Sequence, residues 1–76
     1  MAREIFNKAE MICKQIGYKL GEANILMGLG DIELAEGNKK LAIKDYENAR
    51  LIFQLLKMIE YVKIMDNKIN ECKKTL

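Results

Sequence analysis

The chain lacks histidine and proline, and it has only two cysteines, Cys13 and Cys72, among its 76 residues. Histidine is the commonest general base and the commonest zinc ligand, and two cysteines so far apart in sequence do not make a metal site. Two cysteines are also too few for the disulfide framework of a small secreted domain. The absence of proline, in a chain that is 50% hydrophobic and 32% charged, favours long uninterrupted helices over strands.

The chain also lacks a large excess of either charge and any long hydrophobic run. The formal net charge is +2, which is weaker than the basic excess typical of nucleic-acid-binding domains. No apolar stretch is long enough to cross a membrane, and no targeting signal is recognisable, so we expect a cytoplasmic protein. A chain of this length forms at most one domain, here residues 1–76, with a thin core.

Apolar residues at spacings of three and four predict an all-α fold. The first helix ends at Gly17 and the second at the pair Gly37-Asn38, because glycine readily adopts the left-handed conformation that closes a helix. The predicted helices span residues 2–16, 20–36, 39–56 and 58–75.

Neither glycine nor proline separates the third and fourth predicted helices, so a single helix over residues 39–75 is the alternative. The apolar stripe that ends at Phe53 and Leu56 is regular, and so is the stripe that begins at Val62. The two stripes are out of step by one residue, which favours a bend at residues 57–60.

An internal repeat relates the two halves of the chain. At an offset of 40 residues (Ala2 onto Ala42), the third predicted helix repeats the first and the fourth repeats the second. The other matches are Phe6 with Tyr46, Ala9 with Ala49, Ile12 with Ile52, Cys13 with Phe53, Ile16 with Leu56, Ile25 with Met65, Leu29 with Ile69 and Ile32 with Cys72. A period of this length is typical of helical repeat proteins.

The run from Leu26 to Ala49 resembles a tetratricopeptide repeat (TPR). Small residues at its key positions let helix backbones approach closely, and Tyr46 fills the space between neighbouring hairpins. The sequence departs from the family pattern at Leu26, where tryptophan is usual, at Glu33, where tyrosine is usual, and at Gln54, where proline is usual. The residues that carry the resemblance are Leu29, Gly30, Gly37, Ala42, Tyr46 and Ala49.

This resemblance, to the longer forty-residue variant of the family, implies antiparallel helical hairpins stacked as a short right-handed superhelix. It also implies a protein-interaction module or scaffold that binds a peptide or partner protein on the concave surface. The residues implied for that surface are Asn24, Met27, Asp31, Ile64, Asn67 and Glu71. Plain solvent exposure is the alternative for these six side chains. The carboxylates of Asp31 and Glu71 favour a neutral or basic peptide.

The two ends of the repeat differ in character. The fourth predicted helix carries Asp66 and Asn70 where the second carries Leu26 and Gly30, so it resembles the polar cap of a repeat array. The first predicted helix instead has a second apolar row, and a stripe this wide expects two neighbouring helices, of which the chain supplies one. We therefore expect an upstream segment or another subunit, such as a second copy in a homodimer, to cover this edge. Its residues are Met1, Ile5, Ile12 and Ile16.

Lysines cluster at two places in the sequence, which makes nucleic-acid binding a remote alternative. Asp45 and Glu47 lie beside the first cluster, and no aromatic residues interleave the lysines, so a solvated surface is favoured. The lysines are Lys39, Lys40, Lys44, Lys73 and Lys74. No combination of nucleophile, base and orienting residue is recognisable, so we expect no enzyme activity, no catalytic residue, no metal and no cofactor.

Overall fold

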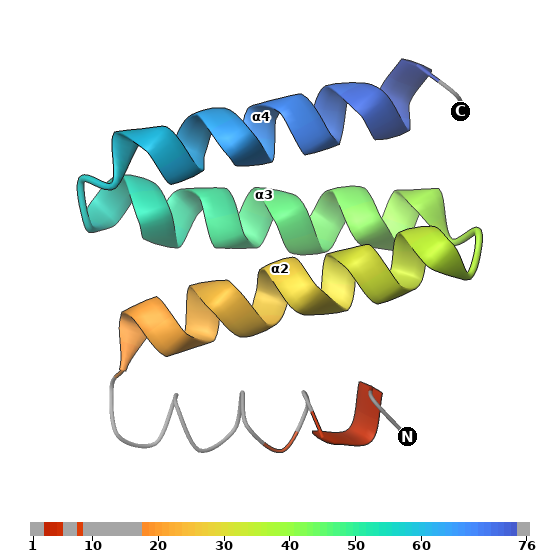
Figure 1. Cartoon of the computed structure of the whole chain (residues 1–76), viewed down its shortest axis with the longest axis horizontal. Coiled ribbons are helices and arrows are strands. Elements are labelled where there is room, and N and C mark those ends of the chain that lie inside the picture. Colours follow the sequence, from red (N-terminus) through yellow and green to blue (C-terminus); the bar gives the residue numbers. More distant parts are fainter. Residues whose placement is uncertain (1–2, 6–7, 9–17, 75–76) are drawn as a thin grey trace.

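A computed structural model describes residues 3–5, 8 and 18–74 of the chain. Its helices α2 (Lys19–Ala35), α3 (Lys39–Leu55) and α4 (Ile59–Lys74) run antiparallel to their neighbours in the order of the sequence (Figure 1). Residues 3–5 and 8 are helical too, and the described part of the chain contains no strand, so the fold is all-α. The bounds of α2, α3 and α4 differ from the predicted spans by at most one residue. Most of the first predicted helix, residues 2–16, lies outside the described residues, as does Thr75.

The turn between α2 and α3 closes around Gly37. This residue has φ 85°, in the left-handed region that glycine adopts without steric cost. The N–H of Gly37 donates to the carbonyl of Leu34 at 3.0 Å, and the N–H of Asn38 donates to the carbonyl of Glu33 at 2.8 Å. These two bonds form a Schellman motif, which satisfies carbonyl groups that the end of α2 leaves without helical partners.

The turn between α3 and α4 repeats this motif with a lysine in place of the glycine. Lys57 has φ 60°, and its N–H donates to the carbonyl of Gln54 at 3.0 Å. The N–H of Met58 donates to the carbonyl of Phe53 at 2.9 Å. The helices α3 and α4 are therefore separate, and the single helix over residues 39–75 is not formed.

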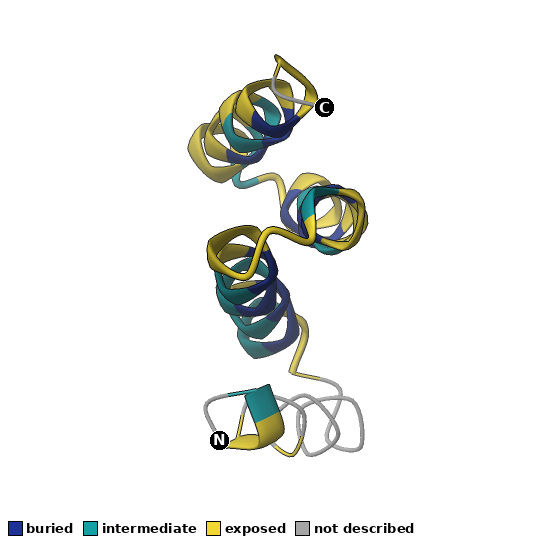
Figure 2. Cartoon of the chain, turned by 90° about the vertical axis from the view of Figure 1, so that its right-hand side faces the viewer, coloured by how far each residue is buried: buried dark blue, intermediate teal, exposed yellow. Residues whose placement is uncertain are grey.

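The helices form two thin layers, with α2 and α4 on one side and α3 on the other (Figure 2). The buried faces of all three helices point toward the space between these layers, and α3 contacts both α2 and α4. The core comprises Ala23, Leu26, Ala42, Ile43, Tyr46, Ala49, Ile52, Phe53, Met65, Ile69 and Cys72. These residues include eight of the nine matched positions in the second half of the repeat, so there the periodic pattern in the sequence is the pattern of burial.

Gly30 of α2 packs closely against the ring of Tyr46 of α3. A Cβ atom at Gly30 would lie 2.5 Å from a ring carbon of Tyr46, so only glycine lets α3 approach α2 this closely. On the other flank of α3, the ring of Phe53 stacks on Tyr61 of α4 with centroids 4.9 Å apart. Tyr46 and Phe53 both belong to α3, which is the helix that contacts both α2 and α4.

Candidate partner-binding face

The six residues predicted to bind a partner lie on α2 and α4, the two helices of the same layer. On α2, Asn24 and Asp31 are exposed, while Met27 is half-buried and packs partly against the core. On α4, Ile64, Asn67 and Glu71 are all exposed. The spacings of three and four place each trio on one side of its helix. The structure thus leaves all six side chains accessible, as either peptide binding or plain exposure requires.

A polar contact joins the two rows of side chains. Lys68 Nζ of α4 lies 3.1 Å from Asp31 Oδ1 of α2, and it lies 5.6 Å from the centre of the Tyr46 ring. The hydroxyl of Tyr46 donates to the same Asp31 oxygen at 2.5 Å. One carboxylate is therefore shared by groups from α3 and α4. We call the surface formed by the six predicted residues and Lys68 the α2/α4 face.

Burial and the neighbouring Asp31 change the acid–base behaviour of Tyr46. The side chain is fully buried. Loss of hydration, followed by the hydrogen bond and the negative charge of Asp31, raises the pKa of Tyr46 well above its ordinary value. The phenol therefore remains protonated and donates its hydrogen bond to Asp31 at any physiological pH.

Sequence reasoning missed Lys68 as part of this face. Lys68 lies four residues after Ile64 and three before Glu71, so helical spacing places the lysine on the same side of α4 as those two residues. Its pairing with Asp31 halves the negative charge that the sequence assigns to this face. The expectation of a neutral or basic peptide rests on both carboxylates, whereas Asp31 is engaged with Lys68.

The α2/α4 face borders a hollow on α4. Asn67 and Glu71 line a hollow of about 450 Å³ together with Asn70, Lys73 and Lys74, all of which belong to α4. This hollow places one lysine pair of the sequence next to two of the predicted binding residues. The other lysines lie at the start of α3, which is at the same end of the molecule as the end of α4 (Figure 1).

Of the four residues of the predicted assembly edge, the structure describes one. Ile5 is 69% exposed, while Met1, Ile12 and Ile16 lie outside the described residues. Arg3 places this part of the chain against α2, because its Nη2 lies 2.6 Å from Glu33 and also contacts Glu36. Ile5 is therefore an exposed apolar side chain beside a segment that is tied to α2.

Two buried carboxylates on α2 were not anticipated. Glu22 and Glu33 are only 8% and 7% exposed, and Glu33 stands where the repeat family usually has tyrosine. Glu33 pairs with Arg3, and Glu22 lies 3.6 Å from Lys19, yet one oxygen of each carboxylate lacks a hydrogen-bond partner. The departure of Glu33 from the family pattern was the available signal that this position has a polar partner.

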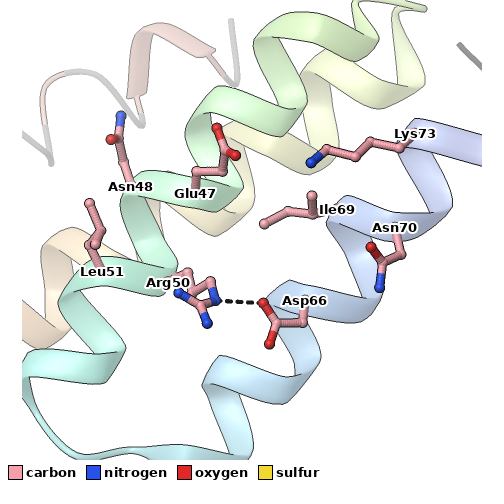
Figure 3. Close-up of a pocket in the computed structure, with 8 residues that line it drawn as sticks. All are labelled: Glu47, Asn48, Arg50, Leu51, Asp66, Ile69, Asn70 and Lys73. Atoms are coloured by element: carbon pink, nitrogen blue, oxygen red, sulfur yellow. Dashed lines mark hydrogen bonds and ion pairs between the residues drawn. The ribbon is translucent and has the colours of Figure 1, made fainter.

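A groove lies between α3 and α4, and side chains of both helices line it (Figure 3). Its volume is about 720 Å³, and an ion pair between Arg50 Nε and Asp66 Oδ1, 2.5 Å apart, crosses it. The carboxylate of Asp66 therefore faces Arg50 rather than an apolar neighbour. The lining residues are Glu47, Asn48, Arg50, Leu51, Asp66, Ile69, Asn70 and Lys73.

The part of the chain that the structure describes offers no cluster of metal ligands. It contains no group of three or more acidic, cysteine or histidine side chains placed to hold a metal ion. Cys72 is 1% exposed and belongs to the core. In this same part of the chain, no helix combines the length and the apolar character that crossing a membrane requires. No family model, curated protein or solved structure matches the sequence.

Proposed function

We propose that this chain is a TPR-like protein-interaction module that binds a peptide or a partner protein on the α2/α4 face. The observation that carries the proposal is the Lys68 to Asp31 contact, which joins exposed rows from two helices into one surface. That surface combines amide side chains with Met27 and Ile64, a mixture that suits recognition of peptide backbone and side chains together.

The engagement of Asp31 refines the ligand expected on this face. Lys68 and the Tyr46 hydroxyl already contact its carboxylate, so a basic ligand would have to compete with both groups. A neutral peptide, held by the amides of Asn24 and Asn67 and by apolar contact with Met27, requires no such exchange. We therefore favour a largely neutral peptide over a basic one.

Selection from a random peptide library, followed by titration of the selected peptides, tests this proposal. The variants Asn24→Arg and Asn67→Arg place a bulky charge on exposed positions of the α2/α4 face. We expect each to weaken binding by about tenfold or more, equivalent to about 1.4 kcal/mol. The matched control is Asn48→Arg, because Asn48 is an exposed asparagine on α3, in the other layer.

Two results would contradict the proposal. Peptides that bind Asn24→Arg and Asn67→Arg as tightly as the unchanged chain do not use this face. If Asn48→Arg alone weakens binding, the peptide occupies the groove between α3 and α4 instead.

A second candidate function is self-association, favoured by the exposure of Ile5. A large apolar side chain that is 69% exposed, next to the Arg3 contact with α2, is suited to contact another subunit. Sedimentation equilibrium over a concentration series tests this candidate. A mass that rises with concentration, and that Ile5→Lys returns to the monomer value, would support it, whereas a constant monomer mass would exclude it.

A further inference from the structure

The groove between α3 and α4 occupies a particular place in the internal repeat. Four of its lining residues belong to α4, and the offset of 40 maps each of them onto a buried residue of α2. The pairs are Asp66 with Leu26, Ile69 with Leu29, Asn70 with Gly30 and Lys73 with Glu33. The side of α4 that faces the groove therefore corresponds, by the repeat, to the side of α2 that is buried in this structure.

The helix that covers Gly30 on α2 is α3, whose Tyr46 ring lies against it. By the same repeat, the groove beside Asn70 is the counterpart of the seat that α3 occupies beside Gly30. A helix that resembles α3 is thus the occupant that the repeat indicates for this groove. Helical repeats are built by adding such neighbours one after another, each contacting the last.

One other segment of the chain repeats α3, namely residues 1–16. In α3, Arg50 marks the flank toward α4, because it pairs with Asp66. Each residue of a helix advances about 100°, so Ile52 lies about 200° from Arg50 around α3. Ile52 is therefore on the opposite flank, toward α2. Ile52 is 9% exposed and belongs to the core.

Three of the four residues of the predicted assembly edge correspond to this side of α3, where Ile52 is the buried counterpart. Residue 5 corresponds to residue 45, residue 12 to Ile52 and residue 16 to Leu56. Ile5, the described member of this set, is 69% exposed, so the described part of its own chain leaves it largely uncovered. Ile5 therefore belongs to the side of the N-terminal segment that corresponds to the α2-facing side of α3.

We propose that the α3/α4 groove receives the N-terminal segment of a second copy of this chain, with Ile5 of that copy directed toward α4. The contact is head to tail, so each copy offers a groove at one end and an apolar edge at the other. Such heterologous contacts build open stacks unless the rotation between copies closes a ring. This inference rests on the second candidate function, self-association, and it names the surface that accepts the edge.

The polar residues of the groove set the strength of this contact. Asn70 has a Cβ atom where Gly30 has none, and a Cβ at Gly30 would already collide with Tyr46. The incoming segment therefore cannot approach α4 as closely as α3 approaches α2. Asp66 adds a charged group where Leu26 is apolar, although Arg50 partly neutralises it. We expect association that is reversible and depends on concentration.

Three matched substitutions test the proposal, each replacing an exposed apolar residue by lysine. Ile5→Lys removes the apolar edge, and Leu51→Lys changes the groove, which Leu51 lines while 57% exposed. Leu41→Lys is the control, since Leu41 is 53% exposed on the same helix and does not line the groove. Because all three side chains are largely exposed, we expect far-UV circular dichroism to show unchanged helicity.

Sedimentation of the single variants and of one mixture gives the decisive result. Ile5→Lys and Leu51→Lys should each remain monomeric, while Leu41→Lys should associate like the unchanged chain. An equimolar mixture of Ile5→Lys and Leu51→Lys should form one-to-one dimers that do not grow, because one intact groove meets one intact edge. Asn70→Lys, which changes the groove from the α4 side, should behave like Leu51→Lys.

Other outcomes overturn the proposal and separate it from the functions above. If Leu51→Lys and Asn70→Lys associate normally while Ile5→Lys is monomeric, two edges pair symmetrically, and self-association stands without the groove. If the unchanged chain is monomeric at every concentration, both self-association and its acceptor are wrong. Neither result bears on peptide binding at Asn24 and Asn67.

Discussion

Replacing Lys57 by glycine tests the structure of the α3 to α4 turn directly. Lys57 is exposed and has φ 60°, a conformation that costs an L residue about 1–2 kcal/mol. Glycine adopts it freely, but glycine also raises the conformational entropy of the unfolded chain, which offsets about 0.4–1 kcal/mol. We therefore expect Lys57→Gly to raise the free energy of unfolding by about 0.5–1 kcal/mol.

Thermal and urea unfolding followed by circular dichroism measure this change. For a domain of this size the expected gain corresponds to an increase in Tm of about 2–8 °C. Lys57→Ala removes the same charge but retains a Cβ atom, so it should give no such increase. Gly37→Ala is the converse control. Its added Cβ would have no atom within 4 Å, so the expected loss of about 1 kcal/mol arises from the backbone alone.

Two results would refute this reasoning. Equal stabilisation by Lys57→Gly and Lys57→Ala would assign the effect to the charge of the lysine instead of its backbone conformation. A loss of stability as large as that of Lys63→Gly, about 1 kcal/mol for an exposed residue inside α4, would mean that residue 57 lies within a continuous helix.

Three further substitutions test the contacts around Tyr46 and the groove. Gly30→Ala should lower the free energy of unfolding by about 1–2 kcal/mol, the overpacking cost less the gain in helix propensity, and the loss should disappear in a Tyr46→Leu background. Tyr46→Phe should cost about 1 kcal/mol, because it removes the hydrogen bond to Asp31. The raised pKa of Tyr46 means that the unfolded chain releases this proton first, so stability falls as the pH rises above about 10, and Tyr46→Phe should lessen that fall in urea titrations. Asp66→Asn should cost less than about 1 kcal/mol, since its pairing with Arg50 is partly exposed, and the difference should vanish at high salt.

The helices and their buried faces followed from local patterns. Spacings of three and four identified Tyr46, Phe53 and Met65 as core residues, and all three are fully buried. Gly37 marked its turn because glycine is the residue that best tolerates the conformation found there. The turn at Lys57 carries no such residue, and the change of phase between two apolar stripes was the signal that located it.

The candidate site was less predictable than the fold. The resemblance to a tetratricopeptide repeat implied accessible positions for Asn24 and Asn67, and both side chains are exposed in the structure. The resemblance did not show that Lys68 would reach Asp31, because that distance depends on how far α2 and α4 lie apart across α3. Whether these residues bind a partner stays a prediction.

By itself, the sequence determined the all-α class, the repeat at an offset of 40 residues and the sides of the helices that are buried. The class and the buried sides depend on residues within a few turns of one another, whose relation is set by the geometry of one helix, and the repeat follows from comparing the sequence with itself. Only the tertiary structure decided that Asp31 is shared by Tyr46 and Lys68, that Glu33 meets Arg3, and that a groove lies beside α4. Each of these contacts joins different elements of the chain, so it depends on the packing distance and register between them, which no local pattern specifies.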